Sequence, residues 1–166
     1  YFEDRVSLSP DDVALVEGCD DGRSYTYKQL NEQANTLANA LIERGVKPGS
    51  PIIVSFPGPM SAEQTISMLA ILKAGCIYVP MDASSIEGRK KQIITDAKAS
   101  FVLTSKKHFH NDDFLKDHFT TDQFIDFAHQ NTDKTAPDTI IQEDSPAYYI
   151  YSSSSSSNSN YFDTFR

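Results

Sequence analysis

The sequence predicts an α/β fold in which helices cover both faces of a layered, mostly parallel sheet that follows an initial β-hairpin. Short apolar segments alternate with longer stretches in which apolar residues recur at helical spacing. Gly45 and Gly75 follow two of these stretches, where a left-handed residue commonly ends a helix. Strands that alternate with helices are joined by right-handed crossovers and pair in parallel.

The first predicted elements are a hairpin and an amphipathic helix. Residues 13–18 (VALVEG) and 24–26 form short strands, and the turn residues DDGR at 20–23 join them. Thr26 and Gln29 have the spacing of a capping box that begins a helix. The apolar stripe of this helix consists of Tyr27, Leu30, Ala34, Leu37, Ala38 and Leu41.

The middle of the chain predicts a buried strand and a buried helix. The continuous apolar run at 51–56 (PIIVSF) is typical of a strand covered on both faces. A second capping box, Ser61 with Gln64, begins a helix that is apolar nearly all round. We therefore expect this helix to be buried.

Three further strands complete the sheet, at 77–80 (IYVP), 101–104 (FVLT) and 147–152 (AYYIYS), and the last is expected to be buried. A third capping box, Ser84 with Glu87, begins a more polar helix between the first two of them. The segment from Ser105 to Pro146 contains no glycine, all four histidines and half of the phenylalanines. We expect an irregular excursion there, with one helix near residues 121–129.

Composition limits the partners of the chain. The net charge of −8 argues against a nucleic-acid partner, because no basic surface would displace the counterions of phosphates. No basic amphipathic segment indicates a membrane surface, and the longest apolar stretch, at 68–72, is too short to span a bilayer. Cys19 and Cys76 form no CxxC pair, so we expect a reduced, cytoplasmic chain, with one disulfide as the alternative. Because the chain begins at Tyr1 without a signal pattern, we expect a piece of a longer protein.

Two other groups of residues, the histidines and a basic run, have two interpretations each. Histidines 108, 110 and 118, with Asp112 and Asp113, form either a metal site or a solvated loop, and we expect no metal because nothing fixes a third ligand. The basic run 89–91 is expected to be a solvated helix face rather than an anion site. Tyr148 and Tyr149 are expected to pack in the core.

Six serines, Ser152–Ser157, follow directly on the last predicted strand. In open α/β sheets, ligands bind where loops leave the carboxyl ends of strands, and hydroxyls and amides there can hold phosphate. The tract contains no glycine and no lysine, although phosphate loops need residues at positive φ and a close backbone approach to the anion. From these residues alone, the tract is either a phosphate loop or a flexible tail.

Three stretches resemble the adenylation domains of nonribosomal peptide synthetases, within the adenylate-forming ligase superfamily. Residues 24–50 (SYTYKQLNEQANTLANALIERGVKPGS) are similar to the stretch that begins with the family motif L-T-Y-x-E-L. Residues 72–82 (LKAGCIYVPMD) are very similar to L-K-A-G-x-A-Y-V-P-[IL]-D, and 146–153 (PAYYIYSS) are similar to L-A-Y-x-x-Y-T-S. The order and spacing also match, so the resemblance covers essentially the whole chain and corresponds to the N-terminal portion of an adenylation domain.

The resemblance implies a division of the chain and a function for its parent. Residues 1–151 would be the N-terminal subdomain of a partial adenylation (AMP-binding) domain, and 152–166 a degenerate phosphate-loop region and tail. The parent would be a ligase that uses ATP with Mg²⁺ to convert an amino acid to an acyl-adenylate. It would then pass the acyl group to a carrier-protein thiol, and the remainder of the domain would be a structural partner.

The family's phosphate loop reads T-S-G-S-T-G-x-P-K-G. On this pattern Ser152 and Ser153 match the first Thr-Ser, and Ser155 and Ser156 match the following Ser-Thr, so these four are the candidate phosphate-binding residues. The glycines, proline and lysine of the pattern fall on Ser154, Ser157, Tyr161, Ser159 and Asn160. We expect no catalytic residue in this chain, no ATP or Mg²⁺ bound by it, no activity alone, and self-association through exposed apolar surface. The alternatives are a degenerate, non-catalytic scaffold or interaction module, and a misread coding sequence over an intact loop.

Overall fold

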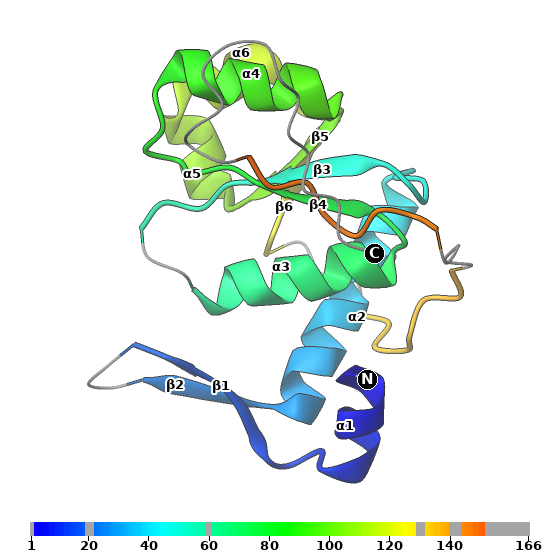
Figure 1. The fold of residues 1–166 in the computed structure, drawn as a ribbon. Coiled ribbons are helices and arrows are strands. Elements are labelled where there is room, and N and C mark those ends of the chain that lie inside the picture. Colours follow the sequence, from blue (N-terminus) through cyan, green and yellow to red (C-terminus); the bar gives the residue numbers. More distant parts are fainter. Residues whose placement is uncertain (1, 19–21, 59–60, 129–131, 140–143, 152–166) are drawn as a thin grey trace.

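The computed structural model describes residues 2–18, 22–58, 61–128, 132–139 and 144–151. Figure 1 shows its elements, which are α1 (Phe2–Leu8), β1 (Val13–Glu17), β2 (Arg23–Thr26), α2 (Tyr27–Glu43), β3 (Pro51–Val54), α3 (Ala62–Lys73), β4 (Ile77–Pro80), α4 (Glu87–Ala97), β5 (Phe101–Thr104), α5 (Lys106–Asn111), α6 (Asp113–His118) and β6 (Phe124–Asp126). Within the described ranges, none of these helices combines the length and hydrophobicity needed to cross a bilayer.

The central sheet has the strand order β4-β3-β5-β6, and every pairing in it is parallel. The register places Ile52 of β3 between Tyr78 of β4 and Phe101 of β5. β1 and β2 form a separate antiparallel hairpin. The predicted fold class, a mostly parallel sheet with helices on both faces and an initial hairpin, is confirmed.

Alternation along the strands builds two cores, because successive side chains of a strand point to opposite faces. Ile52 and Val54 point into the core that α2 and α3 cover, and Ile53 points into the core under α4, α5 and α6. Figure 1 shows these two helical layers on opposite sides of the sheet. Since β3 has neighbours on both edges and helices on both faces, its continuous apolar sequence follows from its position.

Local signals begin and end two of the helices as predicted. The Thr26 hydroxyl accepts a hydrogen bond from the Gln29 N–H at 3.2 Å, while the Gln29 side chain accepts one from the Thr26 N–H at 2.9 Å. Gln64 likewise accepts a hydrogen bond from the N–H of Ser61 at 3.1 Å, ahead of α3. Gly45 and Gly75 follow these helices with φ of 81° and 69°.

The third predicted capping box is wrong. The N–H and hydroxyl of Ser84 both donate to Asp82 Oδ1, at 2.8 and 2.7 Å. This local turn uses the Ser84 side chain, and α4 begins only after Ile86, which has no capping side chain.

The segment from Ser105 to Pro146 is more regular than predicted, and the helix expected near 121–129 is wrong. Phe124–Asp126 form strand β6, which pairs in parallel with β5. Phe124 and Ile125 are both buried but point into different cores, as a period of two requires. α5 and α6 precede this strand, and the ring of Phe109 stacks on that of Phe124 with centroids 4.2 Å apart.

Two asparagines on α2 bind the backbone of residues 133–135. Asn35 donates to the carbonyl of Lys134 at 2.8 Å, and Asn39 donates to the carbonyls of Asp133 and Thr135 at 3.2 and 3.1 Å. The ammonium of Lys134 pairs with the carboxylate of Glu32 at 2.8 Å. These contacts fix the turn at 133–135 against α2 before the chain reaches residues 144–151.

Candidate functional site

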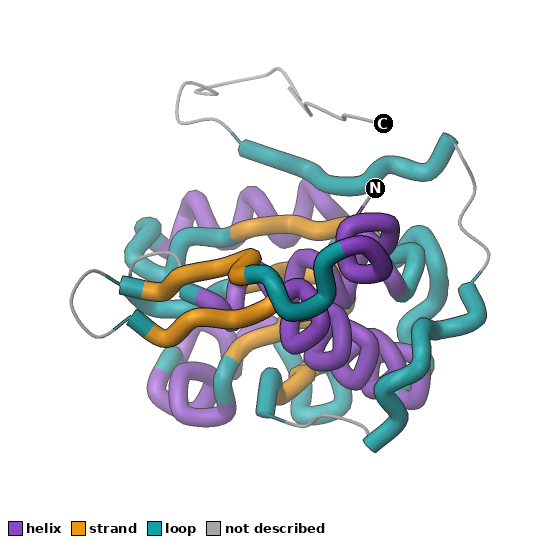
Figure 2. Tube along the Cα trace, turned by 90° about the horizontal axis from the view of Figure 1, so that it is seen from below, coloured by secondary structure: helices purple, strands orange, loops and turns teal. Residues whose placement is uncertain are grey.

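The segment after Pro146 lies beside β4 and runs parallel to it. The N–H of Tyr78 donates to the carbonyl of Ala147, and the N–H of Tyr149 donates to the carbonyl of Tyr78, both at 3.0 Å. Figure 2 shows this segment as a tube along the outer side of the sheet. The predicted parallel direction is therefore present, but the prediction of a buried strand at 147–152 is wrong. The bridge from Tyr78 to Tyr148 joins the segment to the sheet edge, but the segment forms no continuous strand, and Ile150 is 49% exposed.

This parallel direction carries the chain to the carboxyl edge of the sheet, where β3, β4, β5 and β6 also end. Tyr151 is the last described residue and lies directly before the serine tract. The candidate phosphate-binding residues Ser152, Ser153, Ser155 and Ser156 lie outside the described residues. The structure thus describes the segment that leads to the candidate loop, but not the loop itself.

A groove of about 530 Å³ lies at this edge, between the end of β4, α4 and residues 147–151, which we call the exit segment. Ile86, Ile93 and Ile150 are among its apolar lining residues, and Asp82 and Arg89 are its charged ones. Ile86 is 79% exposed, so the groove is bordered by an apolar side chain that no described residue covers. Such an arrangement suits a partner that brings apolar surface together with a charged or polar group.

Tyr151 closes one side of the groove and remains a neutral phenol. Burial raises its pKa to about 12, and the charge of Asp96 acts in the same direction. The guanidinium of Arg89 lies 5.9 Å from the centroid of the Tyr151 ring, in cation–π geometry. Tyr149 and Tyr151 both pack against the core under α4, as predicted for Tyr149.

Asp82 provides a carboxylate beside the same groove. Hydrogen bonds from the hydroxyl and N–H of Ser84 lower the pKa of Asp82, and the charge of Lys90 adds to this effect. The carboxylate is therefore ionised at neutral pH. The groove therefore carries a negative and a positive group side by side.

Aromatic rings close the neighbouring part of the carboxyl edge. Phe56 follows β3 and Phe127 follows β6, and their rings meet edge to face with centroids 5.8 Å apart. The hydroxyl of Thr104, at the end of β5, donates to the carbonyl of Ser55. Because the connections of β3 and β5 leave on opposite faces, this is where open α/β sheets usually bind a ligand. Thr104 and Ser55 meet at this position, and the groove beside β4 is the candidate site.

The histidines do not come together. His108 and His110 are two residues apart on α5, a helix, so their rings point to different sides. His118 Nδ1 lies 2.8 Å from the carbonyl oxygen of Phe114 on its own helix. Across the described part of the chain, no three His, Cys, Asp or Glu side chains lie close enough to hold a metal ion.

The prediction that the basic run 89–91 is a solvated helix face is wrong for Lys90. It is 6% exposed and pairs with the carboxylate of Asp112 at 3.2 Å. His108 Nε2 approaches the same carboxylate oxygen at 3.7 Å. The signal was in the sequence, because Lys90, Ile93 and Ala97 share the spacing of one buried helix face.

Cys76 is buried as a free thiol, and burial raises its pKa to about 11. Its sulfur lies 3.4 Å from the carbonyl oxygen of Lys47. Cys19, the partner in the alternative disulfide, lies outside the described residues.

The fold defines the class of this chain: an open parallel α/β domain, a class in which ligands usually bind at the carboxyl ends of the strands. The chain belongs to the AMP-binding enzyme family, whose model matches residues 2–158. The predicted relation to nonribosomal peptide synthetase adenylation domains, and to their N-terminal portion, is confirmed by the relatives below.

The chain is 34% identical over 159 residues to a dimodular nonribosomal peptide synthase of Bacillus subtilis (strain 168), covering 93% of this chain and 6% of that protein. Among solved structures, it is similar to the nonribosomal peptide synthetase FmoA3 in its alpha-methyl-L-serine-AMP bound form. The TM-score is 0.75 at 28% identity, over 91% of this chain and 16% of that one. The N-terminal subdomain of Klebsiella oxytoca NpsA shares the fold, with a TM-score of 0.73 at 23% identity, over 93% of this chain and 38% of that one. The chain therefore spans a small part of the length of its relatives.

Proposed function

We propose that this chain is the N-terminal part of a cytoplasmic ligase that activates an amino acid with ATP and transfers it to a carrier-protein thiol. One observation supports the proposal most directly: residues 147–151 run parallel to β4 toward the carboxyl edge, and Ser152, where the family's phosphate loop begins, is the next residue in the sequence. The similar FmoA3 structure contains an amino acid joined to AMP. Within the family assignment, this favours an amino acid as the substrate acid.

The reaction has two steps. A carboxylate oxygen of the amino acid attacks the α-phosphorus of ATP, the bond from that phosphorus to the bridging oxygen breaks, and pyrophosphate leaves. The carrier thiolate then attacks the acyl carbon, and AMP leaves with the electron pair of the broken carbon–oxygen bond. Mg²⁺ would neutralise phosphate charge, but the described residues contain no carboxylate cluster that fits it, so no step is assigned to it.

In this proposal the hydroxyls of Ser152, Ser153, Ser155 and Ser156 contact the β- and γ-phosphates. Asn160 replaces the lysine of the family pattern, and the loss of a charge-assisted hydrogen bond costs about 1.5–3 kcal/mol. Serine at a left-handed glycine position costs about 1–2 kcal/mol more. A polypeptide of these 166 residues would therefore bind ATP weakly and would not complete the reaction.

The groove beside β4 supports a structural role for the rest of an adenylation domain. Ile86 and Ile150 are 79% and 49% exposed on either side of it, and the outer edge of segment 147–149 has no further strand among the described residues. We propose that the remainder of the domain packs on this surface. In its absence the same surface would promote self-association, which sedimentation over a range of concentrations measures as a rising mass; a constant monomer mass would contradict this.

Two measurements test the nucleotide proposal. The 166-residue polypeptide is expected to show no amino-acid-dependent exchange of pyrophosphate into ATP, and exchange above the no-acid control would refute its inactivity. The variant with Ser154→Gly, Ser157→Gly and Asn160→Lys should bind ATP at least about 10- to 150-fold more tightly, because the lysine contact alone accounts for about 1.5–3 kcal/mol and the glycines add to it. Ser159→Lys, which adds the same charge at the proline position, is the control and should give a much smaller gain. Equal affinities of the triple variant and the original chain would refute a phosphate loop at this position.

The missing glycines and lysine also favour the second candidate function, a non-catalytic scaffold or interaction module. The coding sequence beyond Arg166 separates the two. A reading frame that continues into the rest of a ligase supports the first function, and a stop codon shortly after Arg166 supports the second.

A further inference from the structure

Residues 2–18 and 22–26 form an N-terminal unit, made of α1, β1 and β2, whose strands do not pair with the parallel sheet, although Phe2, Ala14, Leu15 and Tyr25 pack against the core under α2 and α3. Figure 1 shows the hairpin projecting beyond α3, with α1 beside the start of α2. α1 contains no buried residue, and the described residues of β1 and β2 are at most partly buried. Elements with little buried apolar surface open at a lower free energy than the core does.

The first charged contact of this unit is with the beginning of α3. Glu17, the last residue of β1, accepts a hydrogen bond from the N–H of Ala62 at 3.0 Å. Ala62 is the first residue of α3, where unsatisfied N–H groups and the helix dipole favour a negative charge. The hydroxyl of Ser61 donates a hydrogen bond to the carboxylate of Glu63 at 3.1 Å. A carboxylate from the hairpin therefore satisfies this helix end.

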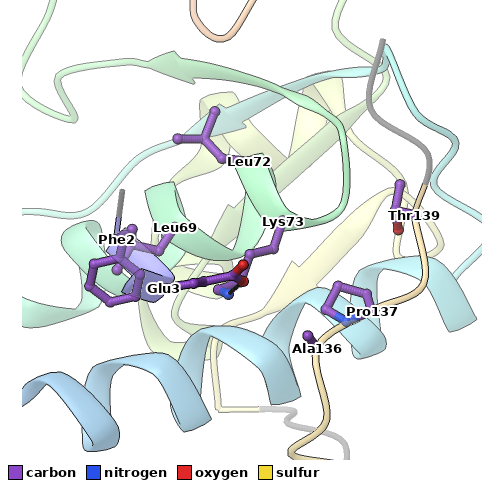
Figure 3. Close-up of a pocket in the computed structure, with 8 residues that line it drawn as sticks. All are labelled: Phe2, Glu3, Leu69, Leu72, Lys73, Ala136, Pro137 and Thr139. Carbon is purple, nitrogen blue, oxygen red and sulfur yellow. Dashed lines mark hydrogen bonds and ion pairs between the residues drawn. The ribbon is translucent and has the colours of Figure 1, made fainter. Parts of the chain in front are cut away.

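The second charged contact is with the other end of the same helix. Glu3 of α1 pairs with Lys73, the last residue of α3, whose side chain is only 10% exposed. Figure 3 shows the two side chains meeting in a pocket of about 400 Å³, with Leu69 and Leu72 of α3 among its walls. The ring of Phe2 lies 5.9 Å from the Lys73 ammonium. Removing Glu3 would leave a nearly buried cation without its partner carboxylate.

We infer that Glu3 and Glu17 are the two points of a latch that holds the N-terminal unit on α3 and releases it as one body while the parallel sheet stays folded. Since α3 has 12 residues, its two ends lie about 18 Å apart, so the contacts are independent. Backbone hydrogen bonds from Tyr27 to Asp12 at 3.1 Å and from Lys28 to Pro10 at 2.9 Å join the unit to the start of α2, where it can turn. Release exposes Leu69 and Leu72 beside Lys73, an apolar surface with a positive charge.

Hydrogen exchange of the full chain, measured by mass spectrometry, tests this latch. The variant Glu3→Gln/Glu17→Gln should exchange the amides of β1 and β2 at least about tenfold faster, since each change removes a charge-assisted contact. Peptides that contain β3 and β5 should be unchanged. Asp11→Asn removes one charge from an exposed position of the same unit and should have no effect. Glu17 also pairs with Arg23 inside the hairpin at 3.2 Å, so Arg23→Gln, which removes this pair and keeps both contacts to α3, is the second control and should have a much smaller effect than the double variant.

The salt dependence of the same exchange rates gives a second measurement. At about 1 M salt the screening length falls to about 3 Å, so the original chain should show faster β1–β2 exchange and the double variant should show no further change. An unchanged β1–β2 rate in the double variant, an equal effect of Asp11→Asn, or a parallel rise in β3 and β5 would each overturn the latch.

Discussion

The buried pair of Lys90 and Asp112 joins α4 to α6, and its removal is expected to destabilise the chain strongly. The two side chains are 7% and 13% exposed, and the ammonium lies 3.2 Å from Asp112 Oδ2. Asp112 Oδ1 separately accepts a hydrogen bond from the N–H of Leu115 at 3.2 Å and so caps α6. Asp112→Asn keeps an oxygen for this cap but removes the charge that Lys90 needs.

Breaking a buried ion pair on one side costs about 3–5 kcal/mol, because the remaining charge stays desolvated. We expect the loss in the free energy of unfolding for Asp112→Asn to lie near the lower end of this range. The reason is that the Lys90 ammonium also lies 5.4 Å from the Phe114 ring, a cation–π contact that the substitution preserves. Asp112→Ala should cost about 1 kcal/mol more through loss of the cap. The double variant Lys90→Met/Asp112→Asn should recover most of the loss, because it leaves no charge in this position.

Urea unfolding monitored by circular dichroism measures these differences. Asp113→Asn is the matched control, because this neighbouring carboxylate is 92% exposed and its change should not shift the unfolding midpoint. A loss below about 1 kcal/mol for Asp112→Asn, or a double variant no more stable than the single one, would refute the view that Lys90 depends on this carboxylate.

Three further predictions concern single side chains. Burial is the largest effect on the pKa of His108 and lowers it, while the charge of Asp112 opposes this shift and that of Lys90 adds to it, so folding favours the neutral imidazole. The resulting contribution to the free energy of unfolding is present above the ordinary histidine pKa of about 6.5 and should be lost as the pH falls below it. In His108→Gln, the midpoint of urea unfolding should therefore depend less on pH between 5 and 8. Cys76, with a pKa raised to about 11, should react with a thiol reagent only as fast as the chain opens, measured in Cys19→Ser; rapid labelling of the folded chain would contradict its burial. Ile53→Ala should cost about 2–5 kcal/mol in urea unfolding, because Ile53 is completely buried; a change under 1 kcal/mol would mean that the core collapses around the site.

Most of the fold was predictable because its signals are local. The capping residues Thr26 and Ser61, the left-handed glycines, and the apolar run of β3 each determine structure within a few residues of themselves. Ser84 shows the limit of such signals. Its spacing to Glu87 is that of a capping box, but Asp82, two residues earlier, binds the same side chain in a turn.

Long-range pairing explains what the sequence could not predict. The apolar residues around Phe124 fit either a short helix or a strand, and pairing with β5 decides for the strand. The role of Asn35 depends on a carbonyl far along the chain, at Lys134. At the candidate site, residue chemistry predicted the carboxyl-edge position of the exit segment. It could not predict that this segment would form no continuous strand at the sheet edge.

The attachment of residues 147–149 has a consequence for the order of assembly. Only two backbone hydrogen bonds join this segment to β4, and both involve Tyr78, so they close a loop that contains α4, α5, α6, β5 and β6. Contacts that span so much sequence form late, after the enclosed elements have folded. During synthesis, the four-stranded sheet can therefore be complete before the ribosome has released Tyr149. Residues 147–149 would then bind to β4 after the sheet has formed. It should also be the first part to detach under force applied to the C-terminus.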